Sequence, residues 1–290
     1  MKKHYYILFI LLLSGATVLV TCGQGREKQS DIRLIIRGDD IGSFHAANDG
    51  CMKSYTDGIM RSVEIMVPCA WYPEAVNMLN EEPGLDVGIH LVMTSEWEQM
   101  KWRPLTGYSS ITDPGGYFFP MVWPNDRFPP DRAFRESGWT LQDVENELRA
   151  QIELAKKDIK SVSHISSHMG FTSADPAIDS LVKALAVEYD LYIEPSDHGV
   201  KRMRVEKPEG GADERIEAFI TALRNLEAGT WLFVEHPAMD TPEMESIGHK
   251  GYAGVGRDRQ IVTDVFTSDR VIREIEKLGI ELISYADLVE

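Results

Sequence analysis

The sequence predicts an α/β fold built on a parallel sheet, and two observations lead to this prediction. Short apolar, β-branched runs recur along the chain, and segments with a helical period separate them. Alternation of strand and helix gives a parallel sheet, because each helix carries the chain back across the sheet face. Seven strands in a chain of this length favour a (β/α) barrel lacking one strand over an open doubly wound sheet.

The individual elements follow from local patterns. In the clearest helix, 141–159, apolar residues three or four positions apart make one apolar face, and Thr140 and Asp143 stand at the N-cap and N3 positions. The predicted strands are 33–37, 62–67, 85–92, 162–167, 191–195, 230–235 and 280–284. The predicted helices are 45–56, 73–81, 141–159, 175–188, 212–227 and 268–278.

One connection, residues 95–139, has no helical period and is too long for an ordinary loop, which predicts a functional loop. It holds Trp97, Trp102, Trp123 and Trp139, four of the six tryptophans. Its aromatic side chains suit stacking on sugar rings, and they equally suit a satellite hydrophobic cluster that holds the loop down. The candidates for substrate contact are Trp97, Trp102, Arg103, Tyr117 and Phe118.

The N-terminal residues 1–22 have the pattern of a bacterial secretory signal, with two lysines before an apolar stretch too short to span a bilayer. The stretch ends in LVTC, which resembles a lipobox and predicts lipidation of Cys22. Residues 23–31 are a polar tether, and residues 32–290 form a single domain. We therefore expect an exported lipoprotein of a Gram-negative bacterium, periplasmic or anchored to the outer membrane through its lipid alone.

The composition argues against a nucleic acid partner. With 46 acidic and 30 basic residues, the chain has a formal net charge of −16, which repels nucleic acid and anionic lipid. Cys51 and Cys69 lie in apolar segments and are expected to be buried thiols, with a disulfide between them left open. The sequence also leaves the oligomeric state open, and a dimer is compatible with it.

Polar residues stand at the ends of four predicted strands. Asp39 and Asp40 follow the first strand, His90 lies near the end of the third, His168 follows the fourth and His236 follows the sixth. In a barrel these strand ends emerge on one face, where active sites are built. One carboxylate with two imidazoles is a ligand set for a divalent metal that leaves positions for water and substrate. Zinc is favoured, and nickel, cobalt, manganese and magnesium are also compatible.

The adjacent aspartates suggest a division of roles. Neighbouring residues of a strand point to opposite faces, but a turn at the strand end can bring both carboxylates to the same rim. One carboxylate can then bind a metal while the other accepts a proton from water. The cation also relieves the repulsion between the two anions, so the metal explains why the pair is tolerated.

Five stretches, taken in order, resemble the YdjC-like carbohydrate deacetylases, a family that includes the bacterial chitooligosaccharide deacetylases. They are LIIRGDDIGSF through CAWYPEAV, NEEPGLDVGIHLVMT, VSHISSHMG, FVEHPA and GIELISYADL. The resemblance implies a distorted TIM-like barrel and metal-dependent removal of acetyl groups from an N-acetylated sugar. By motif it implies that Asp40, His90 and His168 bind the metal. It also implies that Asp39 is the base and that His236 is the acid that protonates the leaving amine.

The sequence departs from the family pattern at two places. The usual D-S-H-x-H-x-H segment of the family corresponds here to residues 166–172 and keeps only its first histidine. Arg37 stands two residues before the aspartate pair, where a small polar residue is usual, and its candidate partners across the barrel are Glu194 and Glu235. His164, on the same predicted strand as the altered segment, is expected to be a core residue.

The leading hypothesis is a lipid-anchored, metal-dependent hydrolase that removes acetyl groups from an N-acetylated sugar or oligosaccharide. A noncatalytic glycan-binding lipoprotein on the same scaffold is the alternative, since the altered histidine segment and the aromatic loop both fit it. A glycosidase that uses two carboxylates is a third hypothesis, with Glu194 and Glu235 as its candidates. The sequence leaves open which sugar is bound and which metal is used.

Overall fold

The computed structural model describes residue 1 and residues 31–289, and their core is a curled parallel sheet. The sheet order is β4–β3–β2–β1–β6–β5, with β7 pairing to β1, and the edge strands β4 and β5 of this described region do not pair. The sheet is therefore a half-barrel. The strands are β1 (Ile32–Ile41), β2 (Ser62–Ile65), β3 (Asp86–Leu91), β4 (Val162–Ser167), β5 (Lys201–Arg202), β6 (Gly229–Glu235) and β7 (Glu281–Ile283).

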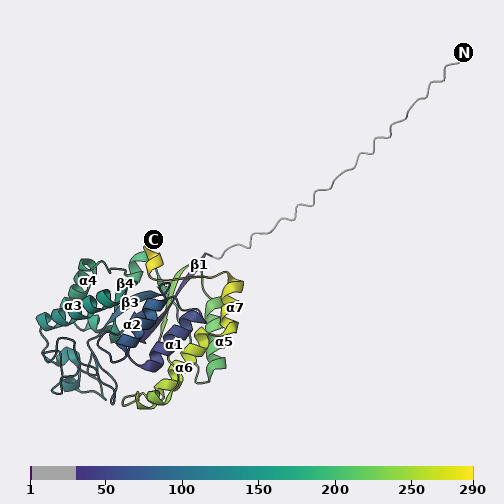
Figure 1. The fold of residues 1–290 in the computed structure, drawn as a ribbon. Helices are drawn as coiled ribbons and strands as arrows, with labels where there is room; N and C mark the ends of the chain where they lie inside the picture. Colours follow the sequence, from purple (N-terminus) through teal and green to yellow (C-terminus); the bar gives the residue numbers. More distant parts are fainter. Residues whose placement is uncertain (2–30, 290) are drawn as a thin grey trace.

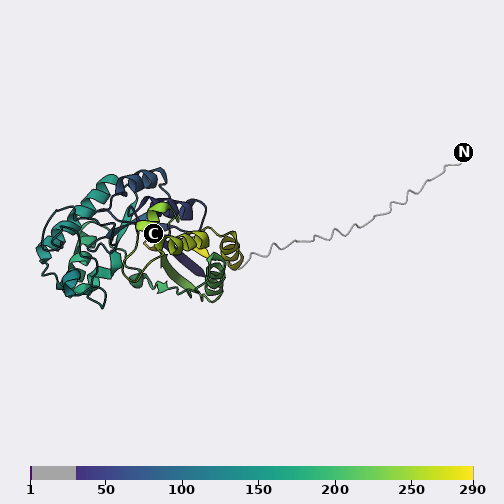
Figure 2. The ribbon, with the colours of Figure 1, turned by 90° about the horizontal axis from the view of Figure 1, so that it is seen from below.

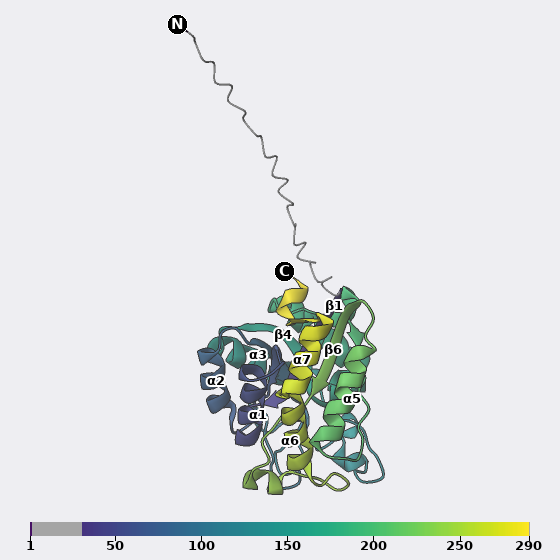
Figure 3. The same ribbon diagram turned by 90° about the vertical axis from the view of Figure 1, so that its right-hand side faces the viewer.

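Helices connect the strands and lie around the outside of the sheet (Figures 1 and 2). On one side of the molecule α5 packs against both α6 and α7 (Figure 3). No helix within residues 31–289 is long and apolar enough to span a bilayer. The helices are α1 (His45–Thr56), α2 (Tyr72–Glu81), α3 (Leu141–Asp158), α4 (Pro176–Glu188), α5 (Ala212–Arg224), α6 (Val255–Phe266) and α7 (Asp269–Leu278).

The predicted fold class, a distorted (β/α) barrel, is confirmed, and six of the seven predicted strands and all six predicted helices are present. The prediction of a strand at 191–195 was wrong. Leu191 is buried, as its apolar character indicated, but a strand also needs a hydrogen-bonded neighbour, and the chain turns at Pro195 into a 3₁₀ helix. The fifth strand is instead β5, whose two residues pair with β6.

The N-terminal predictions fall outside the region that the structure describes. These are the signal peptide of residues 1–22, lipidation of Cys22 and nearly all of the tether 23–31. The two cysteines of the domain, Cys51 and Cys69, are buried free thiols, as expected.

The central strand β1 is irregular at the point where it carries the two aspartates. Its residues Leu34 to Ile36 are fully buried, and it pairs with β6 along one edge and with β7 and then β2 along the other. Between Gly38 and Ile41 the pairing with β2 gains one extra residue on β1. This is a β-bulge, a feature that re-aims side chains next to functional sites.

Residues 95–139 form the long loop that the sequence predicts, with only two short 3₁₀ helices, Pro130–Arg132 and Phe134–Glu136. Its side chains Trp102, Phe118 and Phe134 are buried in the main hydrophobic core. The loop is also tied to α3, because the buried Glu147 carboxylate accepts hydrogen bonds from the backbone N–H groups of Leu105 and Thr106. The aromatic cluster thus holds the loop against the domain.

Candidate metal centre

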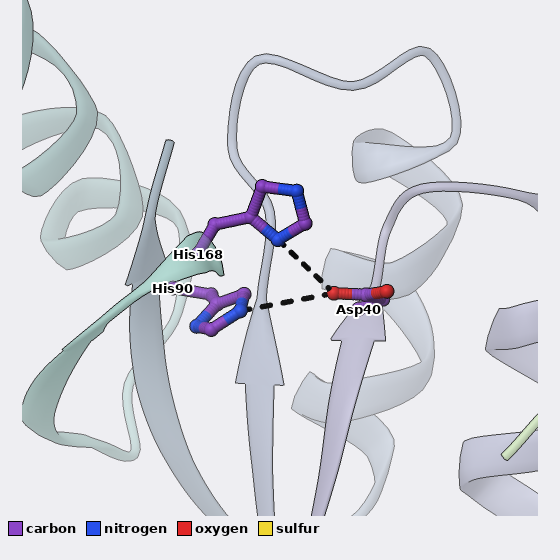
Figure 4. Close-up of side chains that lie close together, drawn as sticks. All are labelled: Asp40, His90 and His168. Atoms are coloured by element: carbon purple, nitrogen blue, oxygen red, sulfur yellow. Dashed lines mark ion pairs between the residues drawn. The ribbon is translucent and has the colours of Figure 1, made fainter. Parts of the chain in front are cut away.

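Asp40, His90 and His168 meet at the carboxyl end of the sheet (Figure 4). The carboxylate at the tip of β1 faces an imidazole from β3 and another at the start of the 3₁₀ helix His168–Ala174. Asp40 Oδ1 lies 3.7 Å from His90 Nε2 and 3.5 Å from His168 Nδ1. All three side chains are buried, so the fold brings the three predicted ligands together.

A divalent cation fits these three groups. Asp40 Oδ1 is buried and has no hydrogen-bond partner among the described residues, which is unfavourable for a carboxylate oxygen. Both facing imidazole nitrogens are too distant for a good hydrogen bond. Ligands about 2.0–2.2 Å from a tetrahedral ion lie about 3.3–3.6 Å apart, and the observed separations are close to this range.

The backbone at Asp40 explains how two adjacent carboxylates reach one cavity. Its φ of 77° is a left-handed conformation, uncommon outside glycine but better tolerated by aspartate than by most residues. Together with the bulge, this conformation overrides the usual alternation of side chains along a strand. Asp39 and Asp40 were predicted to follow the strand, whereas they lie within β1.

Each aspartate has a buried arginine partner. Arg259 Nη2 donates to Asp40 Oδ2 at 2.7 Å, and Arg37 Nη2 donates to Asp39 Oδ2 at 2.9 Å. Burial by itself would raise the pKa of Asp40, but the charge of Arg259 and the neighbouring histidines hold it well below its usual range. Asp40 is therefore ionised and ready to bind a cation.

The expected pairing of Arg37 with Glu194 or Glu235 was wrong. The Arg37 side chain turns toward Asp39 on its own strand and toward Tyr285, whose hydroxyl accepts a hydrogen bond from Nη1 at 2.9 Å. Glu194 instead accepts a hydrogen bond from the backbone N–H of Ser196, in the turn after the mispredicted strand.

A buried hydrogen-bond network orients the ring of His90. His90 Nδ1 lies 2.7 Å from Ser166 Oγ, and Ser166 in turn donates to Glu64. Glu64 also lies 2.7 Å from His164 Nε2, and the His164 ring stacks on Tyr285 with centroids 4.0 Å apart. His164 is thus a core residue, as predicted. Burial opposes ionisation of Glu64, but its cationic neighbours lower its pKa to about 2.

His168 is held by a carboxylate that the sequence analysis did not single out. Its Nε2 lies 3.1 Å from Glu96 Oε2, at the start of the long loop. Burial by itself would lower the pKa of His168, but Glu96 and Asp40 raise it to about 10. A metal that binds here must displace a proton from His168.

The three predicted ligands line a cavity of about 540 Å³, together with Asp39 and His236, the residues predicted to move protons. His236 Nδ1 lies 3.8 Å from Glu235 Oε2, and Lys207 Nζ contacts the other oxygen of Glu235 at 2.5 Å. The cavity lining also includes cations and carboxylates that the sequence analysis missed, namely Glu96, Lys207, Arg215, Asp258 and Arg259.

The predicted substrate contacts are only partly at this cavity. Trp97 lines it, whereas Trp102 and Phe118 are packed in the core. Arg103 lies over the ring of Tyr117, and neither residue belongs to the cavity lining. Of the two carboxylates considered for a glycosidase, Glu235 lines this cavity and Glu194 lines a separate hollow, so the fold does not bring that pair together.

The chain is similar to several known proteins. A family model described as YdjC-like protein matches residues 33–277. A Thermus thermophilus protein named carbohydrate deacetylase is 30% identical over 234 residues, covering 72% of this chain and 79% of that protein. A Vibrio vulnificus protein of the same name is 25% identical and covers 89% of this chain and 97% of its own. A crystal structure also aligns with this chain, that of an Enterococcus faecalis protein described as a cellobiose-phosphate cleavage protein. The alignment has a TM-score of 0.67 at 23% identity and covers 89% of this chain and 99% of that one, which supports the fold.

Proposed function

We propose that this chain, which belongs to the YdjC-like protein family, removes acetyl groups from an N-acetylated sugar or oligosaccharide by metal-dependent hydrolysis. The family resemblance found in the sequence motifs is confirmed by the family match, and relatives named carbohydrate deacetylase support this reaction class. The observation that carries the metal dependence is the buried, unpartnered Asp40 Oδ1 facing His90 and His168.

Asp40 Oδ1, His90 Nε2 and His168 Nδ1 would hold the metal. A bound divalent cation polarises the acyl carbonyl and makes water a better nucleophile at neutral pH. Two imidazoles and one carboxylate favour zinc, and nickel, cobalt, manganese and magnesium remain candidates. Ser166 and Glu96 would fix the orientation of the two imidazoles through their second ring nitrogens, which strengthens metal binding.

The proton transfers are assigned to Asp39 and His236. Asp39 lines the cavity beside the metal ligands and is oriented by Arg37, so it can accept a proton as water adds to the acyl carbon. His236 also lines the cavity and donates a proton to the amide nitrogen as the C–N bond breaks. The products are acetate, which keeps the oxygen from water, and a free amino sugar.

Noncatalytic glycan binding is the second candidate, and the altered histidine segment favours it. Met169 and Gly170, which follow the ligand His168, line the cavity and bring no acid or base to it. Hydrolysis is the stronger proposal, because all five residues assigned to metal binding and proton transfer line the same cavity.

We also propose that the protein is exported and lipidated at Cys22. This proposal rests on the sequence of residues 1–22 alone. Labelled palmitate should be incorporated into the full-length protein in a bacterial host and not into Cys22→Ala. Equal labelling of both proteins would contradict it.

Metal content and acetate release test the proposed reaction together. Elemental analysis of protein purified without chelator should find about one divalent ion in the wild type and in Asp39→Asn, and none in His168→Ala. Only the wild type should release acetate from N-acetylglucosamine oligomers at an appreciable rate. The assigned roles would be wrong if Asp39→Asn lost the metal but kept its activity. Sugar binding without acetate release or bound metal would favour the noncatalytic candidate.

A further inference from the structure

Arg259 lines the cavity and carries a buried hydrogen-bond donor, Nη1, that has no acceptor within residues 31–289. Among the described residues, three buried side-chain atoms without a hydrogen-bond partner belong to residues that line the cavity: Asp39 Oδ1, Asp40 Oδ1 and Arg259 Nη1. Asp39 Oδ1 lies 2.8 Å from Arg37 Nε, and Asp40 Oδ1 faces the two histidines. Of these three atoms, Arg259 Nη1 is the one that donates hydrogen bonds, whereas the two carboxylate oxygens accept them. A buried guanidinium N–H without an acceptor is costly, so an acceptor from a bound molecule is expected.

The Arg259 guanidinium is held firmly in one position. Its Nη2 donates to Asp40 Oδ2 at 2.7 Å, and its central carbon lies 5.6 Å from the ring centres of both Phe44 and Trp97. The residue is only 6% exposed. An ion pair and two cation–π contacts therefore keep the group from turning toward solvent.

The chemistry of the cavity points to one kind of acceptor. Glu235 and Asp258 in the cavity lining supply carboxylates that can accept hydrogen bonds from the hydroxyl groups of a sugar. The oxygen of an acetyl group has no hydrogen to donate, so it needs a donor from the protein. Nη1 belongs to the same planar group that binds Asp40 and is therefore close to the metal ligands, where an acetyl group must lie to be hydrolysed.

We propose that Arg259 Nη1 donates a hydrogen bond to the acyl oxygen of the substrate. The contact strengthens as this oxygen gains negative charge while water adds to the acyl carbon. Arg259 is then a catalytic residue with two contacts, one to Asp40 and one to the substrate. The inference rests on the proposed deacetylase function, because that function places an acetyl group in the cavity.

A binding experiment can test this contact separately from turnover. The metal-free protein, prepared with a chelator, is titrated with the disaccharide of N-acetylglucosamine and with its N-thioacetyl analogue, in which sulfur, a weaker acceptor, replaces the acyl oxygen. Dissociation constants are measured by NMR. The wild type should bind the acetyl compound about tenfold more tightly, the scale of a hydrogen bond to a charged group. In Arg259→Lys this preference should fall below about twofold, because a single ammonium cannot reproduce the two-pronged geometry.

Arg37→Lys is the matched control, since it makes the same change at the arginine that binds the other aspartate, and it should keep the tenfold preference. Arg259→Gln is a second variant at the same position, in case Arg259→Lys does not fold. Circular dichroism of each variant checks that it is folded. Equal affinity of the wild type for both disaccharides would overturn the inference without reference to any variant. An undiminished preference in Arg259→Lys would also overturn it. Failure of the wild type to bind either disaccharide would instead count against the proposed function itself.

Discussion

Replacement of Arg37 by methionine should destabilise the protein strongly, because a buried carboxylate would lose its partner. Arg37 is 8% exposed, and its guanidinium lies 2.8 Å from Asp39 Oδ1 and 3.7 Å from Glu64 Oε1. It also donates to the Tyr285 hydroxyl at 2.9 Å. Methionine is of similar length and flexible, so the substitution removes charge and hydrogen bonds more than packing.

The expected loss can be estimated from what each carboxylate retains. Glu64 keeps His164 at 2.7 Å, whereas Asp39 is left with His90 at 3.8 Å, an imidazole whose pKa is lowered by burial and which therefore supplies little positive charge. One buried pair is therefore broken. Removing one partner of such a pair costs about 3–5 kcal/mol. In a domain of this size, where 1 kcal/mol shifts Tm by about 2–4 °C, Tm should fall by roughly 6–20 °C.

The assay is urea unfolding of metal-free protein, because a metal bound to the folded state would add stability and obscure the difference. Arg37→Met should lower the unfolding free energy by the amount above without changing the m-value. The double variant Arg37→Met with Asp39→Asn, which has no unpaired charge at position 39, should recover about 1–2 kcal/mol of that loss. A loss below about 1 kcal/mol, or a double variant less stable than Arg37→Met, would refute the reasoning.

Three further predictions concern other parts of the site. Ser166→Ala frees His90 Nδ1 and should weaken metal binding about 10–100-fold by calorimetry; unchanged affinity would contradict the orienting role. Glu147→Ala removes the acceptor for two backbone N–H groups of the loop 95–139 and should lower the unfolding free energy by about 1–3 kcal/mol. Proteolysis within the loop should become faster, and unaltered cleavage would contradict the anchoring role. Burial by itself would raise the pKa of Glu235, but its hydrogen-bonded neighbours lower this pKa from 4.5 to about 2. The ionised carboxylate therefore stabilises the fold above pH 4.5, and this stabilisation is lost as the pH falls toward 2. As the pH is lowered over this range, the Tm of Glu235→Gln should therefore fall less than the Tm of the wild type. Parallel curves of Tm against pH would contradict this.

The site residues that could be predicted are those tied to a recognisable strand. His90 lies near the end of β3 and His168 directly follows β4, and parallel strands bring such ends to one face of a sheet. Helix α6 was not predicted, although its buried apolar residues, which include Val255, Val262 and Phe266, lie on one face at helical spacing. Arg259 comes from this helix and contacts a residue 219 positions earlier, so no local pattern reveals the pair. Glu96 stands in a loop without periodicity and gives no local signal either.

The arginines also change the argument for a metal. A bound cation was predicted from the sequence to be the reason that two adjacent aspartates are tolerated. In the structure Arg37 and Arg259 each bind one carboxylate, so the pair is neutralised by the protein itself. The aspartate pair alone therefore says nothing about a metal. What remains is the geometry: Arg259 occupies Oδ2 of Asp40 and leaves Oδ1 directed at two imidazoles without a hydrogen bond from any described residue. Arg259→Lys, which keeps the charge but not the planar fork, should thus weaken metal binding less than His168→Ala does. If the two variants lost metal affinity equally, the orientation of Asp40 by Arg259 would matter as much for metal binding as the imidazole of His168.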